Sequence, residues 1–317
     1  MSRAPEREIY VVPPDLDGER LDRALVRLAR GGSRSRLKAT IEDGRVRIDG
    51  KPCRKPSEAV ASGQRIEIEP PPPAPEIPRS EAARRLPLLF IDEHVIAVDK
   101  PAGVLAHPGA GTTEPTVADL AQVLFGPLPS AQGEERPGIV HRLDRATSGV
   151  MVLGRTEGAL AELMRQFRQR EVEKTYLALV HGEPRFDSDW IETPLGRSPR
   201  DPERISVVQE GEGRAASTYY QVRERFTDFA LVACRPATGR THQIRVHLTS
   251  IGLPVVGDRV YRPRGGVRRP LPPQAPPVER QMLHAARLAL THPDSGERLA
   301  FEAPLPPDFE ALLAWLR

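Results

Sequence analysis

Charged side chains stand directly before an apolar run in GIVHRLDRATSG, residues 138–149. Asp144 lies between Arg142 and Arg145, and the segment GVMVLG follows. An unpaired carboxylate is strongly disfavoured where it is buried, so Asp144 must either have a structural partner or take part in a reaction. An ionised carboxylate can act as a nucleophile or as a general base. Asp144 is therefore the first candidate for a catalytic residue, with a structural ion pair to Arg142 as the alternative.

A second group of charged residues occurs in RPATGRTHQIRVHL, residues 235–248. The pattern predicts a helix that begins near Thr241 and places Arg245 and Leu248 on one face. A zinc site is one interpretation of the histidines, but no pair has the spacing of HExxH or of another recognised ligand motif. The candidate zinc ligands are His107, His141, His242, His247 and His284. A Ser-His-Asp hydrolase is disfavoured because Ser148 does not stand in a GxSxG segment.

The elements that position these groups belong to two units, the first of which spans residues 15–70. Within residues 19–30, apolar side chains recur at the spacing of an amphipathic helix, which a Gly-Gly pair ends. Ser33 is a candidate N-cap for a second helix in SRSRLKATIEDG. Apolar and polar residues alternate in RVRIDGKP around an Asp49-Gly50 turn, and the segment GQRIEIEP follows. This pattern predicts a small sheet.

Positive charge is concentrated in this first unit. Residues 20–55 hold 12 Lys or Arg against 4 Asp or Glu, although the whole chain has a net charge of only +3. Such a concentration predicts a module that binds a polyanion. The unit resembles the αL RNA-binding motif of a ribosomal protein and of several RNA-modifying enzymes. Its arginines are expected to bind RNA phosphates in a salt-dependent manner.

A proline-rich linker over residues 71–85 separates this unit from a larger one over residues 86–317. The segment PPPPAPEIP favours the extended polyproline conformation. In the larger unit, strand patterns such as GVMVLGR, EKTYLALVHG and the hairpin STYYQVRERFTDFALVACRP outnumber helical ones such as GALAELMRQFRQR and DFEALLAWLR. This balance predicts an α+β fold with a mixed, largely antiparallel sheet. Residues 262–280 are too rich in Pro and Gly for regular structure and predict a long loop.

Composition excludes several classes of protein. The chain has 317 residues, of which 39% are hydrophobic and 28% charged, as expected of a soluble globular protein. No stretch approaches the roughly 20 apolar residues of a membrane span, and the N-terminal segment lacks the apolar region of a signal peptide. Cys53 and Cys234 form no CxxC motif, which favours a reducing compartment. We therefore expect a cytoplasmic protein with no membrane partner.

Four separated segments carry a family resemblance: HRLDRATSG, KTYLALVHG, RPATGRTHQIRVHL and MLHAARLALTHP. They occur in the order and approximate spacing of the RluA/RluD-type RNA pseudouridine synthases, so the sequence resembles that family over residues 86–310. The preceding basic unit matches the two-domain form of the family. The resemblance implies an isomerisation of uridine in RNA, which needs no cofactor. Neither GxGxxG after a strand nor GxxxxGK[ST] occurs in the sequence.

The resemblance also implies roles for individual residues. Asp144 corresponds to the catalytic aspartate, and Arg245 to the arginine that pairs with it and keeps it ionised. Tyr176 corresponds to the tyrosine that packs on the target base and can help remove its proton. Leu288 corresponds to an apolar residue that lines the pocket, and Arg142 to the arginine that enters the gap left by the displaced nucleotide.

The implied reaction breaks the bond between the anomeric carbon and a uracil nitrogen, turns the base, and rejoins it through a ring carbon. Asp144 can serve as a nucleophile at the sugar, as a nucleophile at the ring, or as a base at the sugar, and the sequence leaves all three open. The base must be flipped out of the RNA structure, which costs a few kcal/mol. Stacking on Tyr176 and insertion of Arg142 can offset part of that cost.

Further cationic or imidazole side chains are expected to contact RNA. They are Arg20, Arg23, Arg27, Arg34, Arg36, Lys38, Arg45, Arg197, Arg200, Arg204, Arg240 and His242. The predicted partner is large-subunit (23S) ribosomal RNA, with transfer RNA as an alternative substrate. A non-catalytic RNA-binding ribosome-assembly factor is the alternative from a different class, and a monomer is expected.

Overall fold

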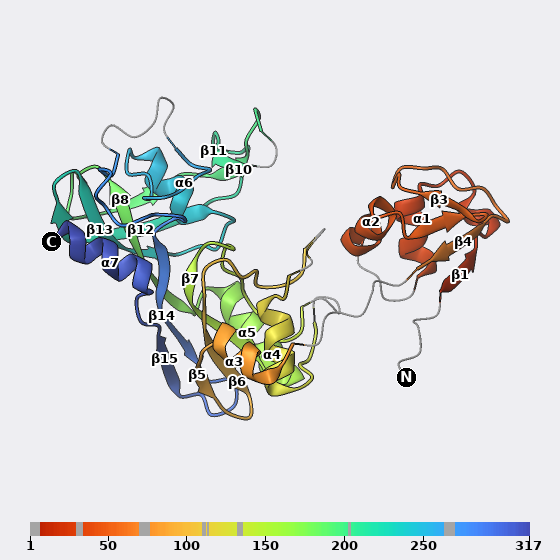
Figure 1. Cartoon of the computed structure of the whole chain (residues 1–317), viewed down its shortest axis with the longest axis horizontal. Helices are drawn as coiled ribbons and strands as arrows, with labels where there is room; N and C mark the ends of the chain where they lie inside the picture. The colour runs from red at the N-terminus through yellow and green to blue at the C-terminus, as the bar shows by residue number, and fades with distance from the viewer. Residues whose placement is uncertain are drawn as a thin grey trace.

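The computed structural model describes residues 7–29, 34–69, 77–109, 112, 114–131, 136–201, 204–262 and 270–317. The elements of residues 7–69 gather in one unit, and those of residues 77–317 form a second, larger unit (Figure 1). Among the described residues, no helix has the length and apolar composition that crossing a bilayer requires.

The N-terminal unit is a small antiparallel sheet with two helices. Its elements are β1 (Glu8–Val11), a 3-10 turn (Pro14–Leu16), α1 (Leu21–Leu28), α2 (Arg34–Glu42), β2 (Val46–Ile48), β3 (Lys51–Cys53) and β4 (Arg65–Ile68). The strands are ordered β1-β4-β2-β3, and Leu21 and Leu25 of α1 are fully buried in the core with Ile66. The two helices and the β2–β3 hairpin confirm the sequence prediction, while Ser33 lies outside the described residues. Strand β1 is absent from that prediction, because a mostly exposed edge strand has no buried face to impose alternation.

A helix occupies part of the predicted linker. α3 (Arg79–Arg85) follows Pro78, and its Ala82 is fully buried in a core that also contains Leu86. The linker prediction over residues 71–85 is therefore wrong for its second half, and the larger unit includes α3. The segment RSEAARR consists mainly of good helix formers, and alanine is small enough to let the helix lie close to its neighbours.

The larger unit is built on a nine-stranded sheet of order β5-β6-β7-β14-β8-β13-β12-β9, with β15 paired to β14. The strands are β5 (Leu88–Ile91), β6 (Val95–Lys100), β7 (Ser148–Gly154), β8 (Glu173–His181), β9 (Ser188–Glu192), β12 (Ser217–Phe226), β13 (Phe229–Pro236), β14 (Leu283–Thr291) and β15 (Arg298–Glu302). Only the β7–β14 pair is parallel among the described strands of this sheet. The predicted α+β fold with a mixed, largely antiparallel sheet is confirmed.

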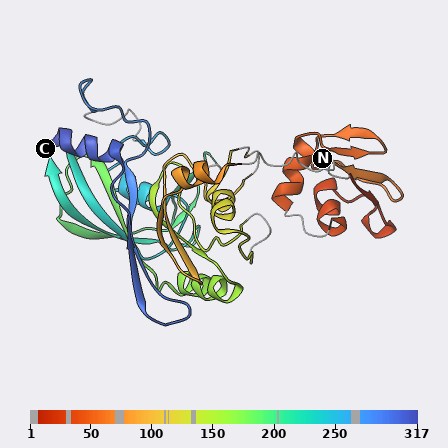
Figure 2. The same cartoon turned by 60° about the horizontal axis from the view of Figure 1, so that its bottom comes forward.

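Four helices cover this sheet, and each belongs to its own core cluster. They are α4 (Val117–Phe125), α5 (Glu157–Gln169), α6 (Gln243–Ser250) and α7 (Pro307–Leu316). Figure 2 shows α7, in blue, lying beside the green strands of the sheet. A separate hairpin is formed by β10 (Leu195–Arg197) and β11 (Ile205–Val207).

Gly149 allows the close approach of β7 and β14. Its φ is +115°, and a Cβ built there would lie 2.2 Å from the carbonyl oxygen of Ala285. Any side chain at position 149 would collide with backbone, which accounts for the glycine after Thr147 and Ser148. The parallel pair thus holds β14 directly beside the loop that carries Asp144.

Candidate active site

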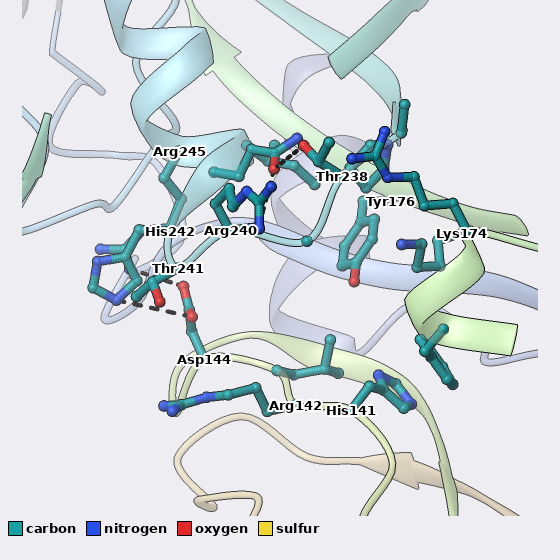
Figure 3. Close-up of a pocket in the computed structure, with 18 of the residues that line it drawn as sticks. His141, Arg142, Asp144, Lys174, Tyr176, Thr238, Arg240, Thr241, His242 and Arg245 are labelled. Carbon is teal, nitrogen blue, oxygen red and sulfur yellow. Dashed lines mark hydrogen bonds and ion pairs between the residues drawn. The ribbon is translucent and has the colours of Figure 1, made fainter. Parts of the chain in front are cut away.

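A cavity of about 550 Å³ collects four of the five predicted catalytic residues. Its lining comes from residues 140–144, from the end of α5 and the start of β8, from residues 236–245, and from Leu283. Figure 3 shows Asp144 on one side of the cavity and Tyr176 facing it, with Arg142 on the same loop as Asp144. Segments far apart in the sequence therefore meet here, as the sequence predicted for Asp144, Arg142, Tyr176 and Arg245.

The Arg245 guanidinium pairs with two carboxylates. Its Nη1 donates to Asp144 Oδ2 at 3.0 Å, while its Nε and Nη2 donate to the two oxygens of Asp258 at 2.7 and 2.9 Å. Arg245 is 4% exposed and Asp258 is 3% exposed. The two parallel bonds to Asp258 fix the plane of the guanidinium, so that its remaining edge is aimed at Asp144.

Asp258 is a functional residue that the sequence analysis did not identify. Burial alone would raise the pKa of its carboxyl, but hydrogen bonds from Arg245 and from the backbone N–H groups of Val260 and Tyr261 lower it. Asp258 therefore stays ionised and holds a buried cation in place. Its signal in the sequence is the one that revealed Asp144, a carboxylate next to an apolar run, here LPVVGD.

His242 stands directly before α6 in the left-handed region, with a φ of 56°. Its Nε2 lies 3.8 Å from Asp144 Oδ1, and its Nδ1 is 2.7 Å from the Tyr261 hydroxyl. Burial lowers the pKa of His242, and the nearby Asp144 opposes that shift. The residue predicted as an RNA contact thus lines the cavity as a second neighbour of Asp144.

Gln243 fixes the loop that brings His242 and Arg240 to the cavity. Its Oε1 accepts from the Thr238 hydroxyl and from the Arg240 N–H, and its Nε2 donates to Ser217 O and to Thr218 Oγ1. The side-chain amide of Gln243 is buried, and these four hydrogen bonds satisfy both its oxygen and its nitrogen. The segment TGRTHQ is therefore held in one conformation before α6 begins.

Tyr176 on β8 faces the cavity from the side opposite Asp144. Burial, and then the charge of Asp144, raise the pKa of its phenol above the usual value. The phenol therefore stays protonated at neutral pH.

The prediction for Leu288 is wrong. Its side chain is 2% exposed and packs in the core with Leu160 of α5 and Phe301 of β15. Leu283, on the same strand, lines the cavity instead. The resemblance alone suggested Leu288 for the pocket, and the packing of α5 and β15 against β14 covers its side chain.

The loop that carries Asp144 is braced by buried cations. Lys100, fully buried, donates to the carbonyls of Pro101, Val104 and Arg145, and burial lowers its pKa to about 7. Arg280 Nη1 lies 3.3 Å from the Ala146 carbonyl, while its Nε and Nη2 donate to Asp308 at the start of α7 at 2.6 and 2.9 Å. The loop is thus tied both to β6 and to the last helix.

His141 begins this loop and is held as a neutral imidazole. Its Nε2 accepts from the Val152 N–H at 3.1 Å, and its ring stacks on Phe167 with centroids 4.5 Å apart. Burial, and then the charge of Lys174, lower its pKa to about 3. The role that the sequence left undefined for His141 is therefore to orient the start of the loop.

Phenylalanine at position 141 is expected to lower the free energy of unfolding by about 1–3 kcal/mol at pH 7.5, because the Val152 N–H loses its acceptor. An unfolded histidine has a pKa of about 6.5, so the unfolded state takes up a proton first as the pH falls. His141 thus stabilises the fold fully above about pH 6.5 and less below it. The difference between wild type and His141→Phe should shrink by about 1.4 kcal/mol between pH 7.5 and pH 5.5.

Urea denaturation followed by tryptophan fluorescence measures this difference, since Trp190 and Trp315 both belong to the larger unit. An equal difference at the two pH values would mean that His141 does not change its protonation on unfolding in this range.

Many of the cations predicted to contact RNA are exposed and form ion pairs within the chain. Arg20 pairs with Asp22, Arg23 with Glu19, Arg27 with Asp15, Lys38 with Glu42, and Arg204 with Asp201. Apart from Arg20, whose partner Asp22 is buried, these pairs are exposed and contribute little to stability, so their cations can exchange partners for phosphates at small cost. Arg197 and Arg200 are exposed. Arg240 lines the main cavity, and Arg240 and Arg197 both line a second cavity beside it. The side chains of Arg34 and Arg36 lie outside the described residues.

No group of three or more His, Cys, Asp or Glu side chains in the described part of the chain is arranged to hold a metal ion. His247 and His284, two of the candidate zinc ligands, form buried hydrogen bonds to Thr218 and Ser148.

Comparison with known proteins shows the family of this chain. A family model described as RNA pseudouridylate synthase matches residues 94–250, and an S4 domain model matches residues 19–66. A ribosomal large subunit pseudouridine synthase D from Nitrosomonas europaea is 44% identical over 313 residues, which cover 96% of this chain and 87% of the relative. The chain belongs to the RNA pseudouridine synthase family.

Two other similarities extend over most of this pseudouridine synthase. An uncharacterized RNA pseudouridine synthase from Chloroflexus aurantiacus is 41% identical over 312 residues, covering 98% of this chain and 94% of the relative. The solved structure of human RNA pseudouridylate synthase domain containing 4 has a TM-score of 0.56 and 28% identity, and it covers 75% of this chain and 95% of its own. The protein is an isomerase with an N-terminal S4 RNA-binding domain, as the resemblance implied.

Proposed function

We propose that this pseudouridine synthase isomerises specific uridines of large-subunit ribosomal RNA and that Asp144 is its catalytic carboxylate. The observation that carries the proposal is the Asp144–Arg245 pair on the wall of the cavity, with Asp144 partly exposed and Arg245 buried. The buried guanidinium orients the Asp144 carboxylate at a place that a ligand can reach. Relatives from Nitrosomonas europaea and Xanthomonas campestris, 44% and 38% identical, bear the name ribosomal large subunit pseudouridine synthase D.

In the proposed reaction, the glycosidic bond from C1′ to N1 of uracil breaks and a bond from C1′ to C5 forms. The C5 proton leaves, and N1 gains one, so the reaction is balanced without an added donor. The Asp144 carboxylate attacks the sugar or the ring, or removes a proton from the sugar. Uracil stacks on the ring of Tyr176, and Arg142, exposed on the same loop as Asp144, fills the gap in the RNA.

Pseudouridine mapping with a carbodiimide tests the proposal. Total RNA from cells with and without this chain is compared, and the deletion strain is supplied with wild type or with Asp144→Asn. We expect sites in large-subunit rRNA to disappear on deletion and to return only with wild type. If the lost pseudouridines lie only in tRNA, the substrate is tRNA and not large-subunit rRNA. If the lost pseudouridines return with Asp144→Asn, Asp144 is not catalytic and the chain acts as a non-catalytic assembly factor.

Removal of residues 1–78 is expected to weaken RNA binding while the larger unit, including α3, still unfolds cooperatively. The S4 unit concentrates positive charge, so its loss should flatten the dependence of log Kd on log salt by about 0.7 to 0.9 for each phosphate that the unit neutralises. Filter binding to a large-subunit rRNA transcript at several salt concentrations measures the slope. The same slope for the truncated and full chains would contradict RNA binding by this unit.

A further inference from the structure

A second basic wall faces the cavity, away from Arg245. Arg168 and Arg170, at the end of α5, and Lys174, at the start of β8, line the cavity beside His141 and Phe167. Figure 3 shows the Lys174 side chain next to Tyr176, across the cavity from Asp144 and His242. None of these three cations takes part in the Asp144–Arg245–Asp258 network.

Lys174 is a partly buried cation without a counter-charge. In the part of the chain that the structure describes, its ammonium has no hydrogen-bond or ion-pair partner, and the charge that acts on it most is the like charge of Arg170. Burial and this repulsion both lower the pKa of Lys174. An unpaired cation that has lost part of its hydration is unfavourable, so its position in a cavity wall calls for an anion from outside the chain.

The spacing along β8 relates this cation to the target base. Lys174 and Tyr176 are two residues apart on one strand, both line the cavity, and such residues lie about 7 Å apart on the same face. A uracil stacked on Tyr176 lies one strand step from Lys174, and the backbone that flanks this nucleotide can pass along the wall formed by Lys174 and Arg170. The phosphodiester is the only charged group of that nucleotide.

We propose that Lys174, together with Arg170, binds the phosphodiester that flanks the extruded uridine and so holds that nucleotide in the cavity. The inference rests on the proposed function, because it requires an RNA substrate whose uridine enters between Asp144 and Tyr176. The cost of leaving Lys174 unpaired in the free protein is recovered when the phosphate arrives, which makes the contact selective for a nucleotide that has left the helix.

The first test measures RNA binding in an Asp144→Asn background, where turnover does not interfere. The probe is a large-subunit rRNA fragment that contains a uridine located by the mapping experiment. Lys174→Met is expected to raise Kd about tenfold and to reduce the slope of log Kd against log salt by about 1, while Lys174→Arg stays close to the parent. The control is Arg225→Met, which removes an exposed cation that pairs with Asp187 at the far end of β12.

The second test places one neutral methylphosphonate beside the target uridine, on its 5′ or its 3′ side. At one of these positions the parent should lose about tenfold in affinity, and Lys174→Met should lose nothing further. Additive losses at both positions would overturn the inference, and so would a Lys174→Met variant that binds like Arg225→Met.

A stability measurement separates a structural role from the proposed one. Because Lys174→Met removes an unpaired cation, the Tm should be unchanged or higher; a Tm lowered by several degrees, with no rescue by Lys174→Arg, would also overturn the inference. If wild type forms no pseudouridine in the fragment, the proposed function is wrong. If wild type forms pseudouridine but Lys174→Met binds like Arg225→Met, only the inference about Lys174 is wrong.

Discussion

Asparagine at position 144 is expected to lower the single-turnover rate of pseudouridine formation by at least about 10⁴-fold, since removal of a reacting group commonly costs that much. The amide oxygen of asparagine can still accept from Arg245 Nη1, and Arg245 keeps both bonds to Asp258, so the fold has no reason to change. RNA affinity should stay within about threefold of wild type, because the substitution alters the reacting carboxylate and leaves every phosphate-binding cation in place.

Tritium release from RNA labelled at C5 of uridine measures this rate, because C5 loses its hydrogen when it joins the sugar. The matched control is Asp187→Asn, which neutralises a carboxylate that is 90% exposed and pairs with Arg225. A rate for Asp144→Asn within tenfold of wild type would exclude Asp144 as the reacting group.

Alanine at position 258 is expected to destabilise the chain by about 3–5 kcal/mol, because the Arg245 guanidinium is left buried with only one partner. Turnover should fall as well, since nothing then fixes the edge of the guanidinium that faces Asp144. The free energy of unfolding is measured in urea, again by tryptophan fluorescence, with Asp187→Ala as the exposed control.

The double variant Asp258→Leu/Arg245→Met separates these two effects. Removing both members of a buried ion pair is often close to neutral for stability, so this variant should recover most of the lost free energy of unfolding but not the activity. If Asp258→Ala unfolds at the same urea concentration as wild type, Asp258 does not stabilise Arg245.

Asp144 and Arg245 could be selected as candidate site residues from the sequence because each stands in a long motif that is unusual for an apolar context, and the structure brings them to 3.0 Å. Asp258 also follows an apolar run, but it lies in no long motif, and its contact with Arg245 of α6 is created only by the tertiary fold. Lys174 likewise reads as an ordinary strand residue until the cavity is known.

The errors in the sequence prediction have identifiable causes. Leu288 was assigned to the pocket through the family resemblance alone, and the tertiary fold places it in the core with Leu160 and Phe301. α3 falls within the predicted linker because the prolines before it dominate the composition of that region, although residues 79–85 contain no proline. Strand β7, strand β8 and the β12–β13 hairpin were predicted, since their apolar runs are long and bounded by turns, whereas the mostly exposed β9 was not.

Arg280 has a consequence for how the enzyme is made. It joins Asp308 of α7 to the Ala146 carbonyl, two residues beyond Asp144. Among the described elements, α7 is the last to leave the ribosome during translation. A nascent chain that has already exposed its S4 domain and its whole sheet still lacks this brace, so the loop that carries Asp144 gains its tie to α7 only when that helix has docked.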